Sequence, residues 1–142
     1  MPQSPCEGLD EETNATLAAD PSPNVRAGLA AHTDAPAVLA TLLTDPDPRV
    51  RARATENPRT TLDQCRLLAN DRLAVVRASA VQSDRLPLDE LHRLAHDRSI
   101  HVRWWLATSS TTPDAVLRVL AEDPRLDVAD QALANLASRG TP

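Results

Sequence analysis

The stretch LLTDPDPRVRARATENPRTT, residues 42–61, holds the pattern that decides the fold of this chain. Asp45 lies three residues after Leu42 and five residues before Val50. Ala54 follows Val50 by four residues, and side chains four apart lie on the same face of an α-helix. The stretch therefore predicts a short helix that buries Val50 and Ala54, preceded by a segment that buries Leu42.

The same columns recur along the chain, so the sequence is built from an internal repeat. An Asp followed five residues later by Val occurs five times, at spacings of 25, 26, 26 and 26 residues: Asp20/Val25, Asp45/Val50, Asp71/Val76, Asp97/Val102 and Asp123/Val128. A Leu stands three residues before each Asp, at Leu17, Leu42, Leu68, Leu94 and Leu120. Repeats of this kind are typical of solenoids, in which each unit covers the apolar stripe of its neighbour.

Each unit predicts two short helices. The first is expected to begin at the Asp, whose carboxylate would cap free backbone N–H groups, with a following Pro such as Pro46 in the first helical position. These helices should end near His32, Asn57, Ser83, Ser109 and Asn135, and the second helices should start at Pro36, Thr61, Pro87 and Pro113. Helices of about two turns are unstable alone in water, so the units must stack. The predicted fold is all-α, an α-solenoid of about five two-helix repeats of 25–26 residues.

The ends of the chain differ from the repeats between them. Residues 1–9 are expected to form a disordered tail, residues 10–139 the helical-repeat domain, and residues 140–142 a second short tail. In the first unit Asn14 replaces the expected core Leu, which predicts a polar cap at this end of the stack. At the other end Gly140 is expected to close a longer helix.

Composition and charge restrict the possible functions. The net charge is −5 and the pI about 5.3, which disfavours the basic surface that non-specific nucleic-acid binding requires. The chain has no uninterrupted apolar run of about 18 residues and no apolar signal segment at its start, so the sequence predicts a cytoplasmic protein that does not bind a membrane. Cys6 and Cys65 are too few for a disulfide framework. Cys65 occupies a column that otherwise holds Leu, and it is expected to be a small buried apolar residue.

The order Leu, Asp-Pro, Val-Arg, Asn-Pro in residues 42–61 resembles the repeat unit of the leucine-rich repeat variant family. The resemblance covers residues 15–135 and implies short helices, alternating α and 3₁₀, in a right-handed superhelix that serves as an interaction scaffold. The founding type of this family also carries a cysteine-rich iron–sulfur module. Two cysteines cannot supply a four-thiolate cluster, so no cofactor is expected here. A HEAT-type unit of about 40 residues fits the period less well.

An Arg follows the Val in four of the five units, at Arg26, Arg51, Arg77 and Arg103. This column could track phosphate groups along one edge of the stack. Its position, about 100° around the helix from the core Val, favours another role. There the stem packs at the core margin, and the guanidinium binds the Asp column bidentately between units. The column is therefore interpreted as structural, with phosphate binding as the alternative.

Trp104 and Trp105 occupy two columns that hold small or polar residues elsewhere, namely Ala27–Gly28, Ala52–Arg53, Ala78–Ser79 and Asp130–Gln131. On a helical wheel Trp104 lies nearly opposite Val102 and Leu106, so at least one indole is expected to be accessible. Accessible Trp is enriched in binding hot spots. The alternative is that both rings fill a groove against a neighbouring unit. The candidate partner-binding residues are Trp104, Trp105, Arg103, Arg77, His101 and Arg98.

The sequence offers little support for catalysis or metal binding. His92, His96 and His101 form a cluster in which the first two could share a helix face as zinc ligands do, but a third ligand is missing and their columns are otherwise polar and variable. No metal site is therefore expected. The chain has no nucleophile elbow and no Gly-rich phosphate loop, and it has only three glycines, so no catalytic residues are predicted.

Three functions follow from these observations. The leading hypothesis is a non-catalytic helical-repeat scaffold that binds a protein partner through one face of the superhelix. The alternative is a nucleic-acid-binding repeat protein, which requires a free Arg column together with Trp as a stacking surface. An enzyme would rest on the histidine cluster alone.

Overall fold

The computed structural model describes residues 9–140, and every regular element in that part of the chain is an α-helix. The predicted all-α class is therefore confirmed for these residues. The ten helices are α1 (Glu11–Ala18), α2 (Pro23–His32), α3 (Pro36–Leu42), α4 (Pro48–Ala54), α5 (Leu62–Ala69), α6 (Ala74–Gln82), α7 (Leu88–Leu94), α8 (Ile100–Thr108), α9 (Asp114–Leu120) and α10 (Leu126–Arg139).

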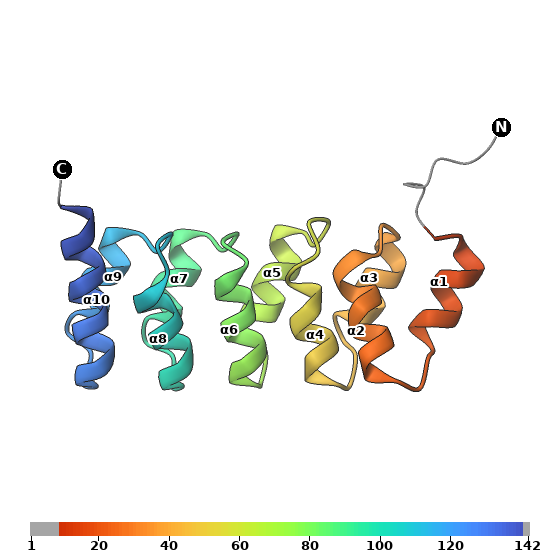
Figure 1. Cartoon of the computed structure of the whole chain (residues 1–142), viewed down its shortest axis with the longest axis horizontal. Coiled ribbons are helices and arrows are strands. Elements are labelled where there is room, and N and C mark those ends of the chain that lie inside the picture. Colours follow the sequence, from red (N-terminus) through yellow and green to blue (C-terminus); the bar gives the residue numbers. More distant parts are fainter. Residues whose placement is uncertain (1–8, 141–142) are drawn as a thin grey trace.

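The helices form two layers of a repeat-like stack (Figure 1). The front row consists of α2, α4, α6, α8 and α10, and each helix packs against the next along the row. The rear row consists of α3, α5, α7 and α9, each packed against the front-row helix that follows it in the chain. At the N-terminal end α1 packs against α2 and α3. Thus α2 and α10 are the front-row helices with a front-row neighbour on one side only.

The core follows the repeating Leu and Val columns. Four Leu and four Val residues of these columns are at most 1% exposed: Leu42, Leu68, Leu94, Leu120, Val50, Val76, Val102 and Val128. Cys65 is also buried, as predicted. Val25 is the exception in its column, with 37% of its surface exposed, because no front-row helix precedes α2 among residues 9–140. The apolar core is therefore covered in the later units and partly exposed at Val25 in the first unit.

The prediction that each first helix begins at its Asp is wrong. Helix α4 begins at Pro48, three residues after Asp45, and its N-cap is Asp47. The other front-row helices show the same offset from their Asp, beginning at Pro23, Ala74, Ile100 and Leu126. The Asp45 carboxylate instead accepts a hydrogen bond from the backbone N–H of Asp47 at 2.9 Å, which makes a turn ahead of the helix. This turn leaves the carboxylate free to bind a second group.

The rear-row helices start at Pro36 or one residue after the predicted Thr61, Pro87 and Pro113. Helix α5 shows why, because Thr61 and Gln64 form a reciprocal capping box around its first turn. All four rear-row helices are α-helices of seven or eight residues. The 3₁₀ helices implied by the family resemblance are absent from residues 9–140.

Both ends of the stack depart in part from expectation. Asn14 is buried, and its amide donates to the carbonyl oxygens of Leu9 and Asp10 while its oxygen accepts from Thr33, so this polar residue lies inside the stack. Helix α10 does not end near Asn135 but continues to Arg139, where Gly140 closes it as predicted. Residues 1–8 and 141–142, which belong to the predicted tails, lie outside the described residues.

None of the helices in the described part of the chain is both long and apolar enough to cross a membrane.

The neighbouring leucines Leu67 and Leu68 of α5 provide a matched test of the stack. Leu68 is 1% exposed and Leu67 is 55% exposed. Leu68→Ala is expected to lower the free energy of unfolding by about 2–5 kcal/mol, because it leaves a cavity between packed helices. Leu67→Ala should change it by less than about 1 kcal/mol. Urea unfolding followed by circular dichroism measures both, and equal effects would contradict the assigned helix face.

Candidate functional site

Four Arg–Asp pairs link consecutive front-row helices. In each pair the Arg Nε and Nη2 atoms donate to the two carboxylate oxygens of the Asp that precedes the next helix, so the contact is bidentate. The Nε–Oδ2 distances are 2.7 or 2.8 Å. We call this set the Arg–Asp ladder, and it comprises Arg26–Asp45, Arg51–Asp71, Arg77–Asp97 and Arg103–Asp123. The predicted bidentate link between units is confirmed at all four positions.

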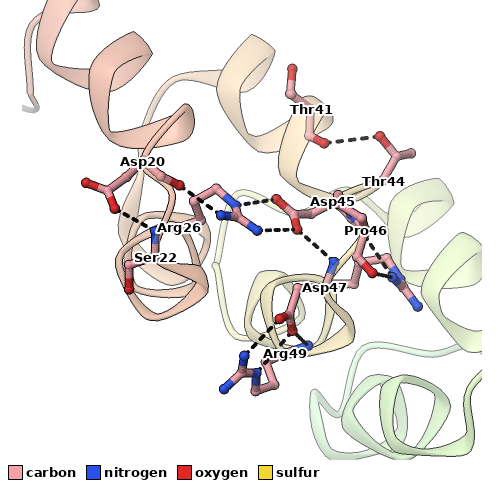
Figure 2. Close-up of polar contacts among 10 residues, drawn as sticks. Asp20, Ser22, Arg26, Thr41, Thr44, Asp45, Pro46, Asp47 and Arg49 are labelled. Atoms are coloured by element: carbon pink, nitrogen blue, oxygen red, sulfur yellow. Dashed lines mark hydrogen bonds and ion pairs between the residues drawn. The ribbon is translucent and has the colours of Figure 1, made fainter.

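The remaining polar atoms of each ladder residue also have partners. The Nη1 atom of each ladder Arg donates to the backbone carbonyl of the Asp six residues earlier, at 2.6–2.8 Å. Figure 2 shows this for Arg26, whose guanidinium lies between the Asp20 carbonyl and the Asp45 carboxylate. Each Arg thus ties the turn before its own helix to the turn before the next one.

Electrostatics favour the charged form of the buried carboxylates. Burial raises the pKa of Asp97, but hydrogen bonds from Arg77 and the Ser99 N–H, together with the Arg77 charge, outweigh burial and hold this pKa below its ordinary value. The same balance lowers the pKa of Asp45 and Asp71. The hydrogen bond to Asp97 raises the pKa of Arg77. These pairs stay ionised at neutral pH.

The ladder determines where two candidate site residues lie. Arg77 and Arg103 are both ladder members, and their side chains are 6% and 13% exposed. Their guanidinium groups bind carboxylates and backbone carbonyls within the stack. Neither lies with the tryptophans as a free cation on the surface.

A second set of inter-unit contacts was not predicted. The Asn57 amide donates to the carbonyl oxygens of Ala30 and Thr33 near the end of α2, and the Asn135 amide does the same for Ala107 and Ser109 after α8. Arg85 donates to the Thr55, Asn57 and Thr60 carbonyls after α4. Thus the free carbonyls at the helix ends are satisfied from the next unit. Asn57 and Asn135 share one column, twelve residues after their Asp, but this column holds His32, Ser83 and Ser109 in the other units, so the repeat pointed to it only weakly.

The exposed side of the front row carries three residue columns, at four, seven and eight positions after each Asp. We call it the outer face, and its residues are Asn24, Ala27, Gly28, Arg49, Ala52, Arg53, Val75, Ala78, Ser79, His101, Trp104, Trp105, Asp127, Asp130 and Gln131. Across α2, α4 and α6 these columns line an open hollow of about 490 Å³. The tryptophans occupy the same columns on α8, the next helix along the row.

Both tryptophan side chains are accessible on α8. Trp104 is 39% exposed and Trp105 is 41% exposed, and their ring centroids lie 5.5 Å apart at an interplanar angle of 79°. This edge-to-face contact orients each ring against the other. His101, also exposed, lies three residues before Trp104 and shares its helix face. Val75, in the His101 column on α6, is 59% exposed.

Charge on the outer face differs on the two sides of the tryptophans. The flanking helix α10 contributes two exposed acids, Asp130 and Asp127, of which Asp127 pairs with Arg125 at 3.5 Å. On the other side, beyond α6, α4 contributes Arg49 and Arg53, which pair with Asp47 and Glu56 of their own segment. The hydrogen bonds from Arg49 lower the pKa of Asp47 to about 2. Among these outer-face charges Asp130 is the one without an ion-pair partner in residues 9–140, and it lies on the helix next to the tryptophans.

The other candidate residues lie apart from the tryptophans or are isolated. Arg98 is exposed in the turn before α8 and donates to the Arg72 carbonyl at 3.2 Å. His92 is half-buried and His96 exposed, and no group of three His, Cys, Asp or Glu residues in the described part of the chain is arranged to hold a metal ion. Burial raises the pKa of the Cys65 thiol, which disfavours a nucleophilic role for it.

No protein-family model matches the chain, and no curated protein is significantly similar to it.

The ladder predicts a large difference between two arginines. Arg77→Ala is expected to lower the free energy of unfolding by about 3 kcal/mol, because it leaves the Asp97 carboxylate buried without its cation. Arg49→Ala, which removes an exposed arginine of the outer face, should have little effect. Chemical unfolding at neutral pH compares the two variants, and a similar loss in both would argue against a structural ladder.

The ladder also predicts acid sensitivity. Asp45, Asp71 and Asp97 have folded-state pKa values below the ordinary value of about 4, so their stabilising contribution is complete above about pH 4 and is lost as the pH falls further. We expect the free energy of unfolding to decline from about pH 4 to pH 2. Asp63→Asn, at a carboxylate that is 94% exposed, should leave this decline unchanged, whereas Asp97→Asn should reduce its slope.

Proposed function

We propose that this protein is a non-catalytic scaffold that binds a protein partner through the outer face, with Trp104 and Trp105 as the central contact. The proposal treats the stack as a right-handed solenoid of about five units, related to the leucine-rich repeat variant type. The exposed tryptophan pair is the observation that carries it. Two large aromatic side chains are accessible in columns where the neighbouring helices carry small or polar residues.

The outer face has the composition of a binding surface around this pair. Trp is the residue type most enriched among interface hot spots, where it is surrounded by contacts that exclude water. Val75 extends the apolar area onto α6, and the hollow across α2, α4 and α6 continues the same columns away from it. The ladder holds α6, α8 and α10 in register, so the surface is preorganised and loses little entropy on binding.

The charges on the outer face suggest how a partner lies on it. Asp130, which has no ion-pair partner in residues 9–140, would attract a basic group beside the tryptophans, whereas Arg49 and Arg53 lie farther along the row and pair with Asp47 and Glu56. A partner segment with an apolar anchor flanked by a basic residue fits this order. His101 adds a side chain that both donates and accepts hydrogen bonds near Trp104.

The nucleic-acid alternative has less support. It needs a row of free cations, but the four ladder arginines bind carboxylates within the stack. It also needs the basic surface that the net charge of −5 disfavours. Base stacking on the tryptophans is then its one remaining support.

Substitution of the tryptophans tests the proposed surface. Trp104→Ala and Trp105→Ala are each expected to weaken partner binding at least about tenfold while leaving the fold intact, because both side chains are partly exposed. Affinity purification with quantitative mass spectrometry should show partners captured by the wild-type protein and lost from the double variant. Leu126→Ala, at a 77% exposed apolar residue outside the outer-face columns, serves as the matched control. Identical partner sets for wild type and the double variant would refute this site.

A further inference from the structure

The N-terminal end of the stack contains an unused ladder position. Every ladder Asp binds an Arg of the preceding front-row helix, but in the described part of the chain no front-row helix precedes Asp20. Its carboxylate accepts from the Ser22 N–H at 2.8 Å and pairs with no cation among residues 9–140. Figure 2 shows this carboxylate directed away from Arg26. Asp20 therefore has the turn geometry of a ladder acceptor without a donor.

The apolar surface next to Asp20 is open in the same way. Val25 is 37% exposed, whereas the four later Val residues of its column are completely buried. With Leu17 and Leu29 it lines a hollow of about 670 Å³ that runs along α2 from Asn24 to His32 and continues to Asp34 in the following loop. Gly28 lies on the same side of α2, and a side chain added there would meet no atom within 4 Å. We call this hollow the N-terminal slot.

The missing Arg and the uncovered Val have one geometric cause. Between α2 and α4, one front-row helix both covers the Val50 stripe and supplies the Arg26 guanidinium to Asp45. A helix placed ahead of α2 in the same manner would cover Val25 and bring an Arg to Asp20. We propose that the N-terminal slot binds an amphipathic helix of a partner protein, with its apolar stripe on the exposed Val25 and an arginine paired with Asp20.

Charge favours a helix of a partner protein over two other possible occupants of the slot, residues 1–9 of this chain and a second copy of the chain. Residues 1–9 of this chain contain no Arg or Lys. A second copy stacked head to tail would present α10, and Ala129 stands there in the ladder Arg column. The charged residues that line the slot, Asp34, His32 and Arg59, lie at or beyond the C-terminal ends of α2 and α4, whereas Asp20 lies just before the N-terminal end of α2. A helix with a basic end and an apolar face is complementary to this arrangement.

A peptide that copies a ladder donor tests this proposal. The probe is a fluorescent peptide of residues 71–83, which contains Val76 and Arg77, held helical by a crosslink between positions 75 and 79 on its outer-face side. We expect it to bind the full chain. Both Asp20→Asn in the protein and Arg77→Gln in the peptide should weaken binding about tenfold, and the two together should weaken it no further. Glu12→Gln, an equal charge change on exposed α1, should alter binding less than about twofold.

Nuclear magnetic resonance locates the bound peptide. Shifts in the backbone amide signals should centre on Val25, Gly28 and Leu29, and Trp104→Ala with Trp105→Ala should leave the affinity unchanged, so this test is independent of the proposed outer-face function. Equal binding of the Arg77→Gln peptide, or shifts confined to the outer face near α8, would overturn the proposal. Concentration-dependent dimers that Asp20→Asn abolishes would assign the slot to a second copy and would also overturn it.

Discussion

The structure depends on one buried ion pair that repeats with the sequence. Each front-row helix is short, and helices of this length gain stability only from packing against neighbours. Apolar contacts supply that packing, but they do not define register, because Leu, Val and Ala columns could slide past one another. A bidentate Arg–Asp contact has a narrow geometry, so each pair fixes the position of one helix relative to the next. Consecutive Asp residues of the repeat are 25 or 26 residues apart, which reflects this constraint in the sequence.

The ladder explains both what the sequence predicted and what it did not. The Val, Leu and Arg columns were visible because each uses one residue type for one purpose. The starts of the front-row helices could not be predicted, because an Asp can be the N-cap itself or can form a turn that precedes the N-cap. Arg26 donates to both carboxylate oxygens of Asp45, and this contact places Asp45 in the turn ahead of the helix and not at the N-cap. The carbonyl contacts of Asn57 and Arg85 escaped prediction for another reason, since a backbone acceptor accepts a hydrogen bond from any suitably placed donor.

The candidate site also contains residues whose placement could be predicted from the sequence and residues whose placement could not. Exposure of Trp104 and Trp105 was predictable, because a bulky residue in a column of small ones has no space reserved for it in the stack. The role of Arg77 was ambiguous, since a periodic Arg fits both a ligand-binding row and a structural link. Only the positions of the carboxylates settle where its guanidinium lies. Val75 is ordinary in sequence, and only its 59% exposure beside α8 connects it with the tryptophans.

The ladder also gives the stack a direction. Helices α2, α4, α6 and α8 each donate an Arg to the Asp turn before the next front-row helix, so the two ends of the row are not equivalent. At the C-terminal end Ala129 replaces the Arg, and no unsatisfied cation remains in that column. At the N-terminal end the Asp20 turn is present although, among residues 9–140, no front-row helix precedes α2. The Asp20 carboxylate forms the same turn contact as the ladder acceptors, with the Ser22 N–H, but has no arginine partner among residues 9–140. The described row therefore ends at α10 on a helix that has no ladder arginine, and at α2 on an Asp that has no arginine partner.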